Sequence, residues 1–171
     1  TSAARRAGRL DALSGRIHWA AECLAQNRLL RIRRRQDDIP ADLDRRRIEQ
    51  LAAGTSFIED IPDERLQAVL ASGRFQPSAD PADLAGFDIA VISVPTPLRE
   101  GMPDLSYIES ASATLAPHIR RGSTVLLEST TYPGTTEELS LPILEHGSGL
   151  EGRVDFHLGY SPERIDPGNA T

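Results

Sequence analysis

The stretch STVLLESTTYPGTTEEL, residues 123–139, decides the fold. An apolar run, 125–127, stops at a group of hydroxyls and a carboxylate, and a Pro-Gly step follows. The residues beyond that step predict a helix, in which Thr135 and Glu138 have the spacing of a capping box. A buried strand that runs into polar residues just ahead of a helix is typical of a parallel α/β sheet, whose strand ends bind ligands.

The same alternation of strand and helix patterns continues on both sides of this stretch. FDIAVISV (87–94) reads as a strand buried on both faces, because it is almost continuously apolar. A helix is predicted over 105–119 with Asp104 as its N-cap, and VDFHLGYSPER (154–164) predicts a further strand. We therefore predict an α/β fold with a Rossmann-like, doubly wound and mostly parallel sheet.

Shorter elements precede these strands. Two short helices are predicted to end at Gly54 and Gly73, and a single turn is predicted to be capped by Asp80. Apolar residues at helical spacing over 10–30 predict one amphipathic helix with an arginine-rich outer face. QDDIPAD (36–42) then breaks the helical pattern at its proline.

Composition limits the classes of function. The chain has 171 residues, 39% of them hydrophobic, which supports one core. It has no apolar run near the roughly 18 residues of a membrane helix, so we expect a soluble, cytoplasmic protein without a membrane partner. A single cysteine, Cys23, excludes an internal disulfide framework, and four scattered histidines give no metal-ligand spacing. No metal site is therefore predicted.

The charge is uneven along the chain. All 19 basic residues are arginines, although the net charge is −6, and residues 1–35 are rich in them. A basic arm on an acidic body is one pattern of nucleic-acid binding, but aromatic residues here are limited to Trp19. A solvated helix face is the preferred interpretation, and a nucleic-acid partner is not expected.

Three predicted strands end in polar, proline-marked loops: SVPTP (93–97), ESTTYPGTT (128–136) and YSPER (160–164). In a parallel sheet these loops lie side by side at one edge. We expect one crevice there, lined by Thr96, Glu128, Ser129, Thr130, Glu163 and Arg164. Such residues are also ordinary loop residues, and their chemistry alone leaves the ligand open.

These motifs carry a resemblance. VISVPTPLREGMPDLSYIE, LLESTTYPGTTEE and GYSPERIDPGN are similar to the NAD-binding domain of the UDP-glucose/GDP-mannose dehydrogenase family. The residues of these motifs are most similar to those of the family's UDP-N-acetylglucosamine 6-dehydrogenase branch. The resemblance covers 42–171, a partial NAD-binding domain, whereas 1–41 is an Arg-rich helical segment atypical of the family.

The resemblance implies an oxidoreductase of polysaccharide biosynthesis. Family members oxidise the C6 alcohol of a nucleotide sugar to a carboxylate with two NAD+ molecules. The implied cofactor is NAD, the implied substrate is a UDP-sugar, and the parent enzyme is expected to be a homo-oligomer. A dehydrogenase of hydroxy acids is a further reading, which the SPER block does not fit.

The resemblance also implies residue roles on the cofactor side. Asp42 stands where the family has the acid that hydrogen-bonds the adenosine ribose hydroxyls. Pro95 and Thr96 are expected at the cofactor's ribose or pyrophosphate. Ser129 and Thr130 are expected near the nicotinamide, with Thr130 beside the catalytic water.

Further roles fall on the third loop. Glu163 is the implied acid/base or water-positioning carboxylate, in contact with both cofactor and substrate, and Arg164 supplies charge to the substrate. Glu128 is expected to be structural. The family's catalytic cysteine and sugar-binding domain are expected beyond residue 171, and Cys23 does not match that cysteine.

One departure from the family stands at the start. The family opens with a strand and a G-x-G-x-x-G turn, but Gly8 and Gly15 are isolated, and RIRRRQDDIPA (31–41) stands where the second strand should be apolar. The preferred interpretation is a truncated or frame-disrupted start, with a sheet incomplete at its N-terminal edge. The alternative is a non-catalytic remnant or binding module with a basic N-terminal helix.

Overall fold

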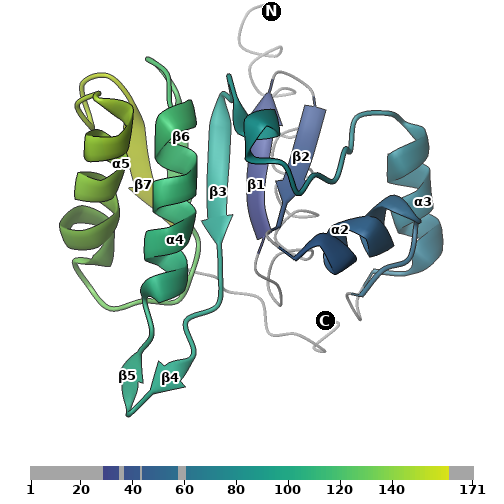
Figure 1. Ribbon diagram of the computed structural model, residues 1–171, viewed down its shortest axis with the longest axis horizontal. Helices are drawn as coiled ribbons and strands as arrows, with labels where there is room; N and C mark the ends of the chain where they lie inside the picture. Colours follow the sequence, from purple (N-terminus) through teal and green to yellow (C-terminus); the bar gives the residue numbers. More distant parts are fainter. Residues whose placement is uncertain (1–28, 35–36, 43, 58–60, 162–171) are drawn as a thin grey trace, which may run out of the picture.

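A computed structural model describes residues 29–34, 37–42, 44–57 and 61–161. Within these ranges the chain forms a five-stranded sheet in the order β2-β1-β3-β6-β7 (Figure 1). Its strands are β1 (Leu29–Arg34), β2 (Asp37–Ala41), β3 (Ile89–Ser93), β6 (Thr124–Leu127) and β7 (His157–Tyr160). Strands β4 (Leu98–Arg99) and β5 (Met102–Pro103) form a separate hairpin, which projects below the sheet in Figure 1.

The helices connect and cover these strands. They are α2 (Arg45–Ala52), α3 (Asp63–Ala71), the 3-10 turns η1 (Pro81–Leu84) and η2 (Ala116–His118), α4 (Ser106–Leu115), the π-helical η3 (Thr135–Ser140) and α5 (Leu141–Ser148). Helices α4 and α5 lie in front of the sheet in Figure 1, whereas α2 and α3 lie beyond its β2 edge. The predicted α/β class is confirmed.

Four of the five strands in this sheet run in the same direction, in agreement with the predicted mostly parallel sheet. β3 pairs with β6 and β6 with β7 in parallel register, so that Ala90, Val125 and Leu158 lie in one row across the three strands. β2 runs in the same direction as β3, because β1 is antiparallel to both. The carboxyl ends of four strands therefore meet at one edge, where a ligand is expected.

β1 is the exception, and it lies between β2 and β3. Only residues 35–36 separate it from β2, and a connection this short joins strands in antiparallel hairpins, whereas parallel strands need a crossover. Leu29 is paired with Ser93, so β1 starts at the edge where β3 ends. The helix predicted over 10–30 is wrong at its last two residues, which pair in β1; residues 10–28 lie outside the described ranges.

The core lies mainly on one face of the sheet. Ala90, Ile92, Val125 and Leu127 are buried there together with apolar residues of α4 and α5. Alternate residues of the same strands, Ile89, Val91 and Leu126, are only half-buried. The prediction of strands buried on both faces is therefore correct for one face only, the one that α4 and α5 cover.

The predicted helix ends are partly confirmed. Gly54 and Gly73 follow α2 and α3 with φ of 77° and 68°, the left-handed conformation that glycine adopts without strain. The Asp80 carboxylate accepts a hydrogen bond from the Ala82 N–H and caps η1. These local signals depend on a few neighbouring residues, which is why the sequence reveals them.

Two capping predictions need correction. The Asp104 carboxylate accepts from the Ser106 N–H at 3.0 Å, but Leu105 holds the N-cap position of α4. The capping box is wrong: Gly134 precedes η3, and the Thr135 hydroxyl donates to the Tyr132 carbonyl at 2.9 Å. The π-helical first turn changes the geometry that a capping box requires.

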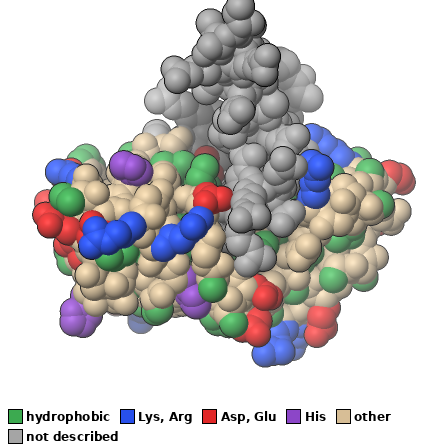
Figure 2. Space-filling model, turned by 90° about the horizontal axis from the view of Figure 1, so that it is seen from above, with side chains coloured by type: hydrophobic (Ala, Val, Ile, Leu, Met, Phe, Trp, Pro, Cys, Tyr) green, Lys and Arg blue, Asp and Glu red, His purple; other side chains and the backbone are tan. Residues whose placement is uncertain are grey.

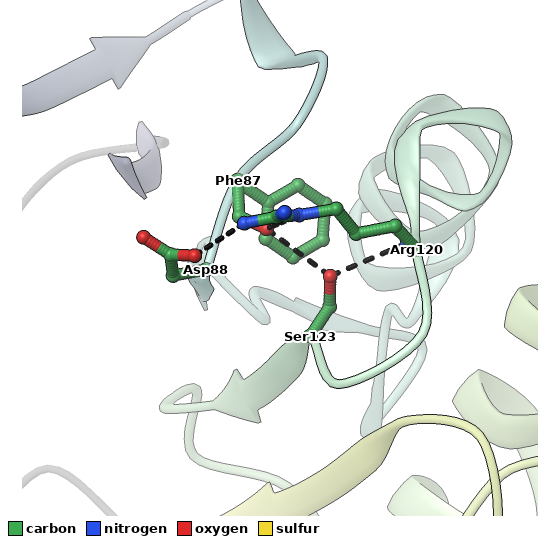
Figure 3. Close-up of polar contacts among 4 residues, drawn as sticks. All are labelled: Phe87, Asp88, Arg120 and Ser123. Atoms are coloured by element: carbon green, nitrogen blue, oxygen red, sulfur yellow. Dashed lines mark hydrogen bonds and ion pairs between the residues drawn. The ribbon is translucent and has the colours of Figure 1, made fainter. Parts of the chain in front are cut away.

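A polar cluster fixes the edge where the parallel strands begin (Figure 3). Ser123 Oγ donates to the Phe87 carbonyl at 3.1 Å and accepts from the Arg120 N–H at 3.3 Å. Arg120 Nε donates to the same carbonyl, and its guanidinium also pairs with Asp88. Figure 2 looks onto this edge and shows arginine and carboxylate side chains next to one another. The cluster joins the chain just before β6 to the start of β3.

We predict that Ser123→Ala destabilises the fold by about 1–3 kcal/mol, because the buried Phe87 carbonyl and the partly buried Arg120 N–H each lose a hydrogen bond. Chemical unfolding followed by circular dichroism measures the change. Ser72→Ala is the matched control, since the exposed Ser72 hydroxyl also donates to one carbonyl and accepts from one N–H. Water replaces those exposed bonds, so equal losses for the two variants would contradict this role of burial.

A second prediction concerns Asp104. Hydrogen bonds from the Ser106 side chain and N–H lower the pKa of this carboxyl below 3.8. Because the pKa of Asp104 is lower in the folded state than in the unfolded state, its ionised carboxylate stabilises the fold at pH values above the unfolded-state pKa. This stabilisation is lost as the pH falls through the lower, folded-state pKa. An NMR pH titration of the Asp104 carboxyl carbon measures its midpoint. Ser106→Ala should move the midpoint upward, and an unchanged midpoint would refute the assignment.

Candidate functional site

The loops that follow β3 and β6 are joined by a buried hydroxyl. Ser129 Oγ accepts from the Val94 N–H at 2.9 Å and donates to the Val94 carbonyl at 2.6 Å. The Ser129 side chain thus takes the place of a strand neighbour for Val94 and continues the pairing beyond the ends of both strands. Ser129 is 4% exposed, so its hydroxyl is buried between the two loops.

A second hydrogen bond joins the same loops farther out. Thr96 Oγ1 donates to the Thr130 carbonyl at 2.6 Å, and Pro95 lies half-buried between Val94 and Thr96. Thr130 itself is exposed. The structure therefore brings together four of the residues predicted for the cofactor side, which are Pro95, Thr96, Ser129 and Thr130.

The third predicted loop is described only at its start. The Ser161 N–H donates to the Leu127 carbonyl at 2.9 Å, which extends β7 along β6 toward the same edge. Glu163 and Arg164 lie outside the described residues. Glu128, expected to be structural, is half-buried, and its N–H donates to the Ile92 carbonyl at 2.9 Å.

Asp42 lies immediately after β2 at this edge of the sheet and is 7% exposed. Its Oδ1 accepts from the Asp44 N–H at 2.9 Å, and Arg47 Nη1 lies 3.8 Å from its Oδ2. The Arg47 guanidinium also lies over the Phe57 ring, 5.3 Å from the centroid. Sequence reasoning missed Arg47, although its place in the first turn of the helix after Asp42 could have indicated it.

A pocket opens beside Asp42, between the end of β2, the turn η1 and helix α4. Its cavity volume is about 160 Å³. Its apolar lining consists of Ala41, Ala79, Pro81, Leu84, Val94 and Ala111. Its polar lining consists of Asp42, Asp44, Asp80, Tyr107, Ser110 and Thr114. Apolar walls with a few polar groups are typical of small-molecule sites.

The size of the pocket restricts what it can hold. An apolar cavity of about 150 Å³ accommodates a single benzene ring, whereas sites for drug-sized ligands usually measure about 300–1,000 Å³. At about 160 Å³ the pocket fits one ring system and not a whole dinucleotide. Any larger ligand must therefore extend from the pocket across the strand ends.

Comparison with known proteins identifies the family to which this chain is similar. Residues 32–171 match the family model described as the UDP-glucose/GDP-mannose dehydrogenase family, NAD binding domain. The match thus begins ten residues before Asp42 and includes all of β2. The chain belongs to the UDP-glucose/GDP-mannose dehydrogenase family.

Individual relatives agree with this assignment. The UDP-N-acetyl-D-mannosamine dehydrogenase of Pyrococcus horikoshii is 41% identical over 122 residues, 71% of this chain and 29% of that protein. The UDP-N-acetyl-D-glucosamine 6-dehydrogenase of Pseudomonas aeruginosa is 46% identical over 88 residues, 51% of this chain and 21% of that protein.

A solved structure gives the same result. The structure of the UDP-D-ManNAc dehydrogenase from Pyrococcus horikoshii superimposes with a TM-score of 0.72 and 39% identity, over 76% of this chain and 31% of that one. The chain therefore spans less than a third of the length of these relatives. The matched part is the family's NAD binding domain, so NAD is the cofactor that the family implies.

The described residues fit the adenosine half of NAD. A buried acid at the end of the second parallel strand is the position from which dinucleotide folds bind the ribose hydroxyls, and Asp42 holds it here. The adjacent pocket has the volume of one ring system. Asp42 and the pocket would hold the adenosine.

The described residues do not fit the pyrophosphate. Dinucleotide folds hold it at a glycine-rich turn between the first strand and its helix, yet β1 has neither such a turn nor such a helix after it. The sequence contains the pattern G-x-G-x-x-G once, at 147–152, where α5 ends ahead of β7. Gly147 is there for packing, because a Cβ would lie 2.5 Å from that of Ala116.

The described ranges contain neither a cluster of metal-binding side chains nor a helix that could span a membrane. No three His, Cys, Asp or Glu side chains in that part of the chain gather as a metal site would require. Among the same residues, no helix has the length and apolar character to cross a bilayer.

We predict that Ser129→Ala separates the two loops. The Val94 N–H and carbonyl lose their partner, which costs about 1–3 kcal/mol and speeds amide hydrogen exchange at Val94. NMR-detected exchange measures this rate at the single residue. Thr130→Ala is the control, because the neighbouring bond uses the Thr130 carbonyl and survives the change. An unchanged exchange rate at Val94 in Ser129→Ala would contradict the proposal that the Ser129 hydroxyl holds the two loops together.

Proposed function

We propose that the chain provides the cofactor side of an NAD-dependent nucleotide-sugar 6-dehydrogenase. The whole enzyme would oxidise the C6 alcohol of a UDP-hexose to the carboxylate with two NAD+ molecules. The observation that carries the proposal is the family's NAD binding domain, matched over 32–171, with a buried Asp42 at the end of β2. The relatives' own names, which are those of UDP-sugar dehydrogenases, support the substrate class.

UDP-N-acetylglucosamine is the sugar nucleotide we propose first. The relative from Pseudomonas aeruginosa, 46% identical over the matched residues, is named for that substrate. Another relative is named for the mannosamine epimer, so the N-acetylated hexosamine is the part of the assignment that both names share. The proposed enzyme would act as an oligomer in the cytoplasm.

The residue roles divide between the two halves of the cofactor. Asp42 would accept hydrogen bonds from the ribose hydroxyls of adenosine. Thr96 and Thr130, joined by their hydrogen bond, would face the nicotinamide side together with Pro95 and Ser129. For the chemical step we propose Glu163 as the acid/base carboxylate with Thr130 near the catalytic water; Arg164 would bind the substrate beside Glu163.

A second candidate function is a non-catalytic remnant. The antiparallel β1 favours it, because this strand stands in the place of the strand that would open the pyrophosphate turn. The arginine-rich segment on which a binding module would depend lies mostly outside the described residues. The two candidates differ in whether residues 42–161 still support turnover when a complete first strand is supplied.

A chimera tests the proposal. Residues 42–161 replace the corresponding segment of the Pyrococcus horikoshii UDP-N-acetyl-D-mannosamine dehydrogenase, which keeps its own first strand and its remaining length. We predict NAD-dependent oxidation of that sugar nucleotide, followed as NADH absorbance. Asp42→Ala in the chimera should raise the KM for NAD+ at least about tenfold, the loss expected for a hydrogen bond to a charged group.

The controls separate binding from folding. Glu49→Ala removes an exposed carboxylate on α2 and should leave both KM values unchanged. The KM for the sugar nucleotide should also stay within about twofold in Asp42→Ala, because adenosine binding is remote from the sugar. A folded chimera that neither binds NAD+ nor turns over would favour the remnant instead.

A further inference from the structure

We propose that the carboxyl edge of the sheet is a self-association surface, on which a second copy of this chain docks across a two-fold axis. The surface is formed by four exposed side chains, which we call the apolar rim: Leu98, Met102, Tyr132 and Tyr160. The proposal does not rest on the proposed function. It names a surface and a partner, which the family assignment leaves open.

The first observation is where the exposed apolar side chains lie. Among the described residues five large hydrophobic side chains are exposed, and four of them form the apolar rim. Leu98 and Met102 belong to the hairpin after β3, Tyr132 follows β6, and Tyr160 ends β7. Because these strands are parallel, the four side chains lie at one edge of the sheet. Scattered apolar side chains are normal on a surface, whereas a group of them at one edge marks an interaction site.

The hairpin is the most exposed part of the apolar rim. It projects below the sheet in Figure 1, and Leu98 and Met102 are 74% and 66% exposed. Its register pairs Leu98 with Pro103 and Arg99 with Met102, so the two large apolar side chains lie on opposite faces of the hairpin. An isolated two-stranded hairpin is marginally stable in water. Burial of both faces against another surface would therefore stabilise it.

The charges at the tip of the hairpin identify a second copy as the occupant. Arg99 and Glu100 are adjacent, exposed and opposite in charge. In the described part of the chain neither of them forms an ion pair. In a two-fold interface every contact between two different residues is made twice, so Arg99 would pair with Glu100 of the partner subunit and Glu100 with Arg99 of the partner subunit. The same symmetry would place Met102 against the partner subunit's Tyr132, a favourable contact between sulfur and an aromatic ring.

The turn of the hairpin holds Glu100 at a conformational cost. Its φ is 54°, and that of Gly101 is 82°. Two-residue hairpin turns with positive φ at both positions favour Asn-Gly or Asp-Gly, whereas glutamate is uncommon in the left-handed region. Such strained residues gather where the strain serves a function. The position of this carboxylate is thus a second indication that the tip of the hairpin makes a specific contact.

The experiment is sedimentation equilibrium of the full 171-residue chain over a range of concentrations. We expect a reversible dimer with a dissociation constant on the order of micromolar, because the surface is small. Met102→Gln should raise that constant at least about tenfold, since a symmetric dimer loses the same apolar contact twice. Val154→Gln is the matched control, because Val154 is 70% exposed but lies before β7, at the opposite edge. If circular dichroism shows Met102→Gln to be unfolded, Leu98→Gln replaces it.

A charge swap tests the identity of the partner. Arg99→Glu and Glu100→Arg should each weaken the dimer, and the double variant should restore its dissociation constant to within about threefold of the original. Glu100→Asn should stabilise the turn and still weaken the dimer, which a purely structural role of Glu100 would not produce. Met102 is the chain's single methionine, so its methyl group gives one NMR signal, which should shift as the dimer forms.

Each outcome decides the proposal. A dimer that Met102→Gln weakens, that Val154→Gln leaves intact and that the charge swap restores supports it. Equal weakening by the two glutamine variants would mean non-specific apolar association and overturns it, as does a double variant that stays monomeric. A chain that is monomeric at every concentration also overturns it. If NAD+ then slows amide exchange in residues 98–103 of that monomer, the hairpin covers a ligand instead of a second copy.

Discussion

The parallel pairing of β3 with β6 is the constraint on which the rest of the structure depends. A buried serine secures it at each end: Ser123 bonds the Phe87 carbonyl before β3, and Ser129 bonds both main-chain groups of Val94 after it. Between them, the two strands present the row of residues on which α4 and α5 pack. Because both ends are fixed, the loops that follow have one defined separation at the edge that carries the candidate site.

The sequence reveals the elements whose signals are local. The strands β3, β6 and β7, the glycines after α2 and α3, and the Asp80 cap all follow from a few adjacent residues, and the structure has them. The strand-end loops were also predicted to meet, because parallel strands leave little choice of edge. The hydrogen bond from Thr96 to Thr130 is a consequence of that topology.

What the sequence does not reveal depends on distant partners. Leu29 and Leu30 fit a helical pattern, but strand pairing determines their conformation: Leu29 pairs with β3, and Leu30 pairs with both β2 and β3. The pocket beside Asp42 combines residues from β2, η1, β3's end and α4, and no spacing in the sequence predicts its volume. The capping box fails because η3 is π-helical, and its i→i+5 winding does not keep the spacing between Thr135 and Glu138 that a capping box requires.

The outer side of β2 affects how the molecule meets other chains. Ser78 forms an isolated bridge with Ala41, in which the Pro40 carbonyl accepts from the Ser78 N–H and the Asp42 N–H donates to the Ser78 carbonyl. Pro40 itself has no N–H to offer an incoming strand. In the described ranges no strand pairs with the far side of β7. Strand addition is therefore hindered at the end of β2, whereas among the described residues the β7 edge has no comparable cover and is the more open route to edge-to-edge aggregation.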